Sequence, residues 1–214
     1  MESGEDFKIL SYDEFSSLLD VCSLSGEIPR SLARLVTLKL DVLELSVDDR
    51  KKVLASIWDY YPFISEKHIR EELCGRLSEN MIHEIMHENM PNNPSNPKYD
   101  YLIYLHTPNY YGVRNDYILQ KLRKHNPAIT SIMGSEEELL KCPCCGYRTF
   151  DQRGMYFICD VCFWEDDGVD HDEDLSGPNH MTLGEGRANF KKYGACDARS
   201  IDSVDPEGKM KYTQ

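Results

Sequence analysis

The sequence predicts an α+β protein whose small C-terminal domain is organised by cysteines, and three observations indicate this class. Apolar residues recur at spacings of three and four along residues 7–90, as they do in amphipathic helices. The stretch MPNNPSNP at 90–97 contains three prolines and three asparagines, so a helix does not continue through it. Five of the eight cysteines then fall within residues 142–162. We therefore expect a helical region at 1–92, a small mixed α/β connecting region at 93–140, a cysteine-rich domain at 141–197 and a loosely ordered tail at 198–214.

Capping residues mark the helices of the first region. Ser46, with Asp49 three residues later, resembles a capping box before VDDRKKVLASIWDYY. Ser78 is a second N-cap residue, before ENMIHEIMHENM. Further helices are expected after Ser11, Pro29 and Ser65.

The connecting region combines one expected strand with one expected helix. KYDYLIYLH at 98–106 is rich in Tyr, Leu and Ile, which favours a strand. NDYILQKLRKH at 115–125 ends in basic residues, as the dipole of a short helix prefers. After Cys196 the chain has few apolar residues, which predicts the loosely ordered tail.

The overall charge bears on location and partners. The chain of 214 residues carries 24 basic and 37 acidic side chains, a formal net charge of -13, which repels nucleic acid and favours a basic partner. No stretch approaches the roughly 18 uninterrupted apolar residues of a membrane span, and MESGEDFKIL lacks the features of a signal peptide. We expect a cytoplasmic protein, in which clustered thiols are more often metal ligands than disulfides.

Two cysteine pairs predict a metal site. Cys142 with Cys145, and Cys159 with Cys162, each have two residues between them, so each pair reaches one metal ion from a single turn. Gly146 allows a left-handed turn beneath the metal. Together with YRTFDQRGMYFI between the pairs, this spacing predicts a zinc ribbon, and four thiolates leave zinc no open position for catalysis.

Some ligand alternatives stay open at this level. Iron or an iron–sulfur cluster also accepts four cysteines. Cys144, His171 or His180 would each serve if one of the four were turned away. Cys22, Cys74 and Cys196 are isolated and are expected to be buried or incidental. A capping box formed by Thr182 and Glu185 predicts a short helix appended to the ribbon.

Three strings extend the pattern beyond the four cysteines: CPCCG, CDVCFWEDDG and SGPNHMTLGEGRANFKKYGACD. From Cys142 to about Asp197 the sequence resembles the bacterial cysteine-rich CPCC family. The resemblance implies a small zinc-ribbon protein, and some members of the family are found among the immunity proteins of bacterial polymorphic toxin systems. It does not cover the helical first half of the chain.

An acidic run beside the ribbon suggests how such a protein would meet its partner. WEDDGVDHDED places seven acidic residues next to a tryptophan, which suits the positive groove of a basic nuclease toxin. A solvated acidic loop is an equally good interpretation. A calcium loop is not, because Leu175 and Met181 stand where glycine and a bidentate glutamate are needed. The expected partner contacts are Trp164, Glu165, Asp166, Asp167, Asp170, Tyr110 and Tyr111.

HEIMH at 83–87 raises a competing hypothesis, a zinc metallopeptidase. His83 and His87 would hold the metal and Glu84 would act as general base. No third ligand follows in the expected pattern. The sequence therefore favours a non-catalytic protein-binding module, an immunity protein against a nuclease toxin, over a metallopeptidase or a zinc-ribbon adaptor for another protein partner.

Overall fold

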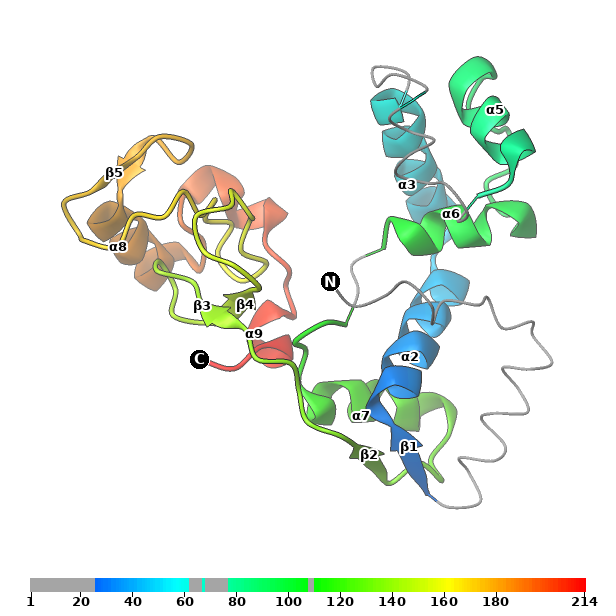
Figure 1. Cartoon of the computed structure of the whole chain (residues 1–214), viewed down its shortest axis with the longest axis horizontal. Coiled ribbons are helices and arrows are strands. Elements are labelled where there is room, and N and C mark those ends of the chain that lie inside the picture. Colours follow the sequence, from blue (N-terminus) through cyan, green and yellow to red (C-terminus); the bar gives the residue numbers. More distant parts are fainter. Residues whose placement is uncertain (1–25, 62–66, 68–76, 108–109) are drawn as a thin grey trace. The chain divides into compact units, whose positions relative to one another are not determined.

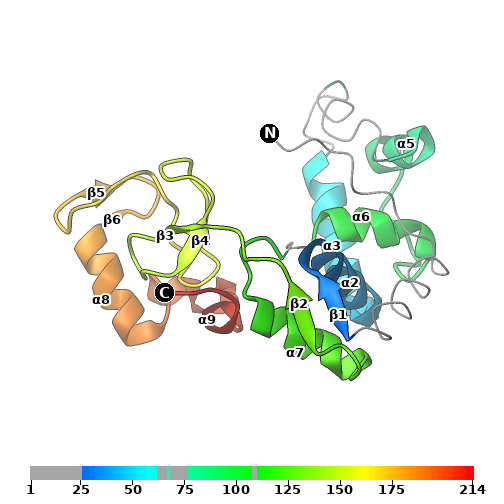
Figure 2. The same ribbon diagram turned by 60° about the horizontal axis from the view of Figure 1, so that its bottom comes forward.

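The computed structural model describes residues 26–61, 67, 77–107 and 110–214 (Figures 1 and 2). Helices and short strands are mixed along these residues, which confirms the α+β class. The chain divides into two compact units. Leu35–Asn109 forms one of them, and the other combines the chain before Leu35 with the chain after Asn109.

The unit within Leu35–Asn109 is helical and has its own core. It contains most of α2 (Arg30–Glu44), together with α3 (Val47–Tyr60), α5 (Glu79–His87), the 3-10 helix η2 (Pro97–Tyr99) and α6 (Asp100–Leu105). The predicted caps are confirmed, because the side chains of Ser46 and Ser78 accept hydrogen bonds from the backbone N–H groups of Asp49 and Met81. The core contains Val42, Leu54, Ile57, Trp58, Tyr61, Ile82, Ile85, Tyr99, Leu102 and Ile103.

The strand predicted at 98–106 is wrong, since these residues form η2 and α6. Tyr99, Leu102 and Ile103 are all buried. Spacings of three and four place them on one face of a helix, whereas a strand would have turned Leu102 and Ile103 to opposite sides. The helices expected after Ser11 and Ser65 lie outside the described residues, apart from Lys67.

In the other unit, a parallel strand pair joins distant parts of the chain. β1 (Glu27–Pro29) pairs with β2 (Ser131–Met133), in the register Glu27 to Ser131 and Pro29 to Met133. The predicted helix at 115–125 is confirmed as α7 (Asn115–His125). The buried side chains beside this pair include Ile28, Ile118, Leu122 and Ile129.

The described cysteines, which fall between residues 142 and 196, belong to the same unit, and this part of the chain consists of short strands and one longer helix (Figure 1). β3 (Leu140–Lys141) pairs antiparallel with β4 (Arg148–Phe150), and β5 (Leu175–Ser176) with β6 (Met181–Thr182). The predicted capping box of Thr182 and Glu185 is confirmed at the start of α8 (Leu183–Tyr193).

Residues 198–214 differ from the loosely ordered tail that the sequence predicts. They form the 3-10 helix η3 (Ala198–Ser203) and α9 (Gly208–Lys211). Tyr212 is buried and donates a hydrogen bond of 2.7 Å to Asp160, and the backbone N–H of Arg148 donates to Thr213. Hydrogen bonds and one aromatic side chain hold a segment that has few apolar residues. Within the described part of the chain, no helix has the length and apolar character needed to cross a membrane.

Candidate metal centre

Four cysteine side chains converge on one point in the interior. The Sγ atoms of Cys142, Cys145, Cys159 and Cys162 all lie within 4.8 Å of one another, and all four residues are buried. The Sγ atoms of Cys142 and Cys162 are 3.6 Å apart, as are those of Cys145 and Cys159. Sulfurs at the corners of a tetrahedron around zinc would be about 3.8 Å apart, given zinc–sulfur bonds of about 2.3 Å. The predicted grouping is therefore confirmed, and its spacing suits a metal ion.

The two cysteine pairs occupy turns that share one hydrogen-bond pattern. In each turn the carbonyl of the first cysteine accepts a backbone N–H from four residues later, at 2.9 Å in the first turn and 2.7 Å in the second. The N–H of the same cysteine donates to the carbonyl five residues later, at 2.8 and 2.9 Å. The donors and acceptors are Gly146 and Tyr147 for Cys142, and Phe163 and Trp164 for Cys159.

The residue that follows each pair has a left-handed backbone. Gly146 has a φ of 81°, as its position predicts, and Phe163 has a φ of 66° at the equivalent place in the second turn. A side chain in this region of backbone space is disfavoured by roughly 1–2 kcal/mol. The first turn avoids that cost by using glycine, whereas the second turn tolerates it within the surrounding structure.

Burial and the close approach of the thiols shift their pKa values. Burial raises the pKa values of the Cys142 and Cys162 thiols. Burial also acts to raise the pKa of Cys159, but hydrogen bonds from the other three cysteines and from the hydroxyl of Thr149 outweigh it and lower that pKa. Metal ligation requires deprotonated thiols, so a bound divalent cation would displace the protons that burial favours.

Neighbouring elements fix both turns. β3 and β4 flank the first turn, and a bridge between Ile158 and Glu165 flanks the second. The backbone N–H of Cys196, after α8, donates to the carbonyl of Cys162 at 2.6 Å. From α8 itself, Arg187 Nε donates to the carbonyl of Pro143 at 2.9 Å.

The other candidate ligands lie outside the group of four. Cys144 and Cys196 are buried. Burial, followed by the electrostatic interaction with Cys144, raises the pKa of Cys196 to about 12. His171 and His180 are exposed, and Cys22 and Cys74 lie outside the described residues. Within the described part of the chain, the four paired cysteines form the one group of three or more candidate ligands.

Three of the residues predicted to contact a partner are instead buried. Trp164 and Asp166 have no exposed surface, and Tyr110 is 4% exposed. Side chains alternate along the extended stretch after the second cysteine pair, which turns Trp164 and Asp166 inward together. Asp166 accepts hydrogen bonds from Arg153 Nε at 2.8 Å and from the Gly154 N–H at 2.7 Å. These residues are therefore structural and are not available as surface contacts.

The other four predicted contacts are at least partly accessible. Glu165 and Asp167 are partly buried, and both take part in local hydrogen bonds, with Asn179 and Gly177. The side chain of Asp170 is 67% exposed and forms an ion pair with Arg153. Tyr111 is 37% exposed and stacks beneath the guanidinium of Arg34.

The structure also reveals a surface that the sequence analysis missed. Met155, Tyr156, Phe157 and Ile158 are consecutive, apolar or aromatic, and 48% to 61% exposed. The sequence pattern predicts only ordinary hairpin residues at this place between the cysteine pairs. The signal in the sequence is the run of four apolar or aromatic residues without a polar residue between them, because a strand with one side on a core would alternate the two kinds.

The HEIMH motif belongs to the other unit and has a different arrangement. The rings of His83 and His87 lie 4.8 Å apart, and the side chain of His83 is 65% exposed. Glu84 accepts hydrogen bonds from Lys98 Nζ at 2.8 Å and from the Tyr99 hydroxyl. The residue required as general base is thus engaged in an ion pair.

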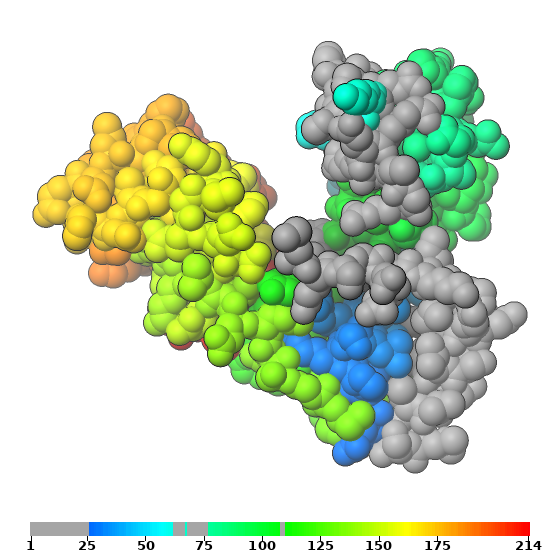
Figure 3. Space-filling model, in the orientation of Figure 1, coloured from blue at the N-terminus to red at the C-terminus, as the bar shows by residue number. Residues whose placement is uncertain are grey.

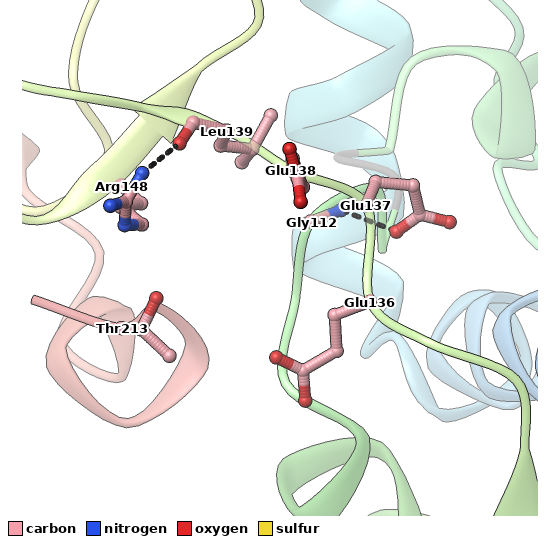
Figure 4. A pocket seen from close by; sticks show the side chains of 7 residues that line it. All are labelled: Gly112, Glu136, Glu137, Glu138, Leu139, Arg148 and Thr213. Carbon is pink, nitrogen blue, oxygen red and sulfur yellow. Dashed lines mark hydrogen bonds between the residues drawn. The ribbon is translucent and has the colours of Figure 1, made fainter.

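A polar cavity of about 340 Å³ lies in the unit that contains the cysteines (Figure 4). One of its three glutamates, Glu137, forms ion pairs with Arg30 and Arg34 and accepts the Gly112 N–H at 2.9 Å. Partial burial acts to raise the pKa of Glu137, but these hydrogen bonds and charges lower it to about 2. The cavity is lined by Gly112, Glu136, Glu137, Glu138, Leu139, Arg148 and Thr213.

These features define an α+β protein with a buried four-cysteine site that is able to bind a metal ion. Residues 140–210, about a third of the chain, match the family described as Cysteine-rich CPCC. The match includes all four clustered cysteines and α8, and it supports the resemblance drawn from the sequence. No curated protein and no solved structure matches the chain.

Proposed function

We propose that the four cysteines bind one zinc ion and that residues 140–210 form a zinc ribbon in which the metal is structural. Two similar turns with short sulfur–sulfur distances support this proposal. Four thiolate ligands at this spacing favour zinc over the harder divalent cations. Because all four coordination positions would be filled by protein, the metal would stabilise the fold and perform no chemistry.

Metal analysis of cysteine variants tests this step. The purified chain should contain one equivalent of zinc, and Cys145→Ser should lose it. Cys196→Ser is the matched control, because this buried cysteine is outside the group of four. Substitution with cobalt should give the absorption of tetrahedral thiolate coordination. Iron in place of zinc, or zinc retained by the Cys145→Ser variant, would contradict the proposal.

On this scaffold, we infer that the chain acts as a non-catalytic protein-binding module. The observation that carries the inference is the closed character of the site: four buried thiolates leave no position for a substrate. The net charge of -13 favours a basic partner. The resemblance to the CPCC family adds a specific form, an immunity protein that blocks a basic nuclease toxin.

Co-expression tests this specific form. The reading frames beside the gene should encode a protein with a basic nuclease domain, and co-expression of this chain should restore growth to cells that produce that domain. The Cys145→Ser variant should fail to protect them. Neighbouring genes without such a domain, or toxicity that persists despite a stable complex, would reject the immunity function and leave the zinc proposal unaffected.

A further inference from the structure

We propose that Met155–Ile158, here named the docking segment, is the surface through which this chain binds a basic partner protein with an apolar face. The proposal rests on the protein-binding function proposed above. In this proposal, the aromatic residues of the docking segment contact the partner in place of Trp164, which is buried. In Figure 3, the longer stretch of the chain that contains the docking segment is coloured yellow.

The side chains of the docking segment are exposed to solvent. The four residues are 54%, 61%, 48% and 49% exposed in chain order. Each of the four side chains is about half exposed or more, so the rest of the described chain leaves all of them open to solvent. With about 200 Å² for each side chain, the exposed area is roughly 400 Å², within the range of patches that mark functional surfaces on soluble proteins.

The docking segment is also held in a fixed conformation. The Tyr156 N–H donates to the Asp166 carbonyl at 2.8 Å, and the Asp166 N–H donates to the Phe157 carbonyl at 2.9 Å. At one end of the segment, the buried carboxylate of Asp166 accepts the Gly154 N–H. At the other end, the second cysteine turn begins at Cys159. A surface ordered in advance loses less conformational entropy when it binds.

Backbone strain supports the same assignment. Tyr156 has a φ of 61°, although an aromatic residue is disfavoured there. Glycine would remove this strain, and the chain uses glycine at the left-handed positions 154 and 168 nearby. The tyrosine side chain is 61% exposed and therefore contributes little to the core. Strained residues of this kind concentrate at functional sites.

Charge decides which occupant fits. Residues 151–174 include nine acidic side chains and one basic side chain, Arg153. A second copy of this chain would bring the same negative field to the interface, which disfavours self-association. A partner with lysine or arginine around an apolar centre complements both features, because interfaces combine an apolar core with a polar rim. Glu165 pairs with Ile158 of the docking segment, and Asp170 forms an ion pair with Arg153. Both acidic residues would belong to that rim.

Synthetic peptides probe this surface on the full-length, metal-loaded chain. A labelled peptide of alternating leucine and lysine should bind, as measured by fluorescence anisotropy. Peptides of alternating leucine and glutamate, or serine and lysine, should bind at least tenfold more weakly. Raising the salt concentration should weaken the binding of the first peptide, because exposed charges are screened.

Two variants of the docking segment and one matched control locate the binding. Met155→Ser and Phe157→Ser should each lower the affinity for the leucine–lysine peptide at least tenfold, which is about 1.4 kcal/mol. Met210→Ser should leave it unchanged, since Met210 is 52% exposed, against 54% for Met155, and lies on α9. Zinc content and thermal unfolding identify any variant that fails to fold. Met155 is 54% exposed, so Met155→Ser should fold normally and still tests the binding if Phe157→Ser does not fold.

Several results would overturn the proposal. Equal binding of the leucine–lysine peptide by all three variants would place the contact elsewhere. Equal affinity for the serine–lysine peptide would reduce the effect to charge alone. A dimer in sedimentation that Phe157→Ser abolishes would make a second copy the occupant. Protection from a toxin that survives Phe157→Ser would reject this surface while leaving the immunity function in place.

Discussion

Asp166→Asn tests whether a buried carboxylate organises the loop between the two cysteine pairs. Asp166 is fully buried and accepts hydrogen bonds from Arg153 and from the backbone of Gly154. Asparagine keeps the shape of the side chain but removes its charge. Its amide NH2 group would replace Oδ1 of Asp166, a buried atom that has no hydrogen-bond partner. Breaking a fully buried ion pair costs about 3–5 kcal/mol. Because the side chain of Arg153 is 27% exposed and can be partly solvated, we expect a loss of about 2–3 kcal/mol.

Asp170→Asn is the matched control, because Asp170 pairs with the same arginine from the surface. Its side chain is 67% exposed, so this substitution should cost less than about 1 kcal/mol. Urea unfolding of the purified protein measures both losses of stability, followed through the fluorescence of Trp164. Trp58→Phe as a common background removes the other tryptophan, which belongs to the helical unit. Equal losses for the two substitutions, or a loss below about 0.5 kcal/mol for Asp166→Asn, would refute the reasoning.

Three further predictions use the same unfolding assay. Gly186→Ala should destabilise the protein by about 1–2 kcal/mol although alanine favours helices, because its Cβ would lie 2.7 Å from the ring of Trp164; unchanged stability would show that the ring has room to shift. Phe163→Gly should be about 1 kcal/mol more stable than Phe163→Ala, owing to the φ of 66°, and the reverse order would contradict the strain. Glu137, with its pKa lowered to about 2, should contribute stability that is fully present above its unfolded pKa and is lost as the pH falls toward 2. Glu137→Gln should weaken the dependence of stability on pH in this range. If the variant loses stability with falling pH as the original protein does, other carboxylates cause the dependence.

The grouping of the four cysteines could be predicted from the sequence, because local spacing determines which sulfurs reach one point. Cys142 and Cys145 lie in one turn, and so do Cys159 and Cys162, so only the approach of the two turns depends on tertiary structure. The caps at Ser46 and Thr182 were predictable for the same reason, since each hydrogen bond spans three residues.

The partner contacts could not be predicted in this way. The sequence does not say which side of the stretch at 164–166 faces inward, and that direction is set by α8, where Gly186 leaves room for the Trp164 ring. The strand predicted at 98–106 failed similarly, because tyrosine, leucine and isoleucine suit either a strand or a buried helix. Packing of Leu102 and Ile103 on the same side selected the helix.

The pairing of β1 with β2 has a consequence for biosynthesis. The chain leaves the cysteine-bearing unit after residue 34 and returns to it at residue 110, so Ser131 joins Glu27 only after about a hundred further residues have been made. At roughly 5–20 residues per second, the first strand waits between about 5 and 20 seconds on the ribosome for its partner. During that interval the intervening helices are the part of the chain that is free to fold. The helical unit within Leu35–Asn109 therefore has the first opportunity to fold, and the unit that contains the four clustered cysteines is completed after it.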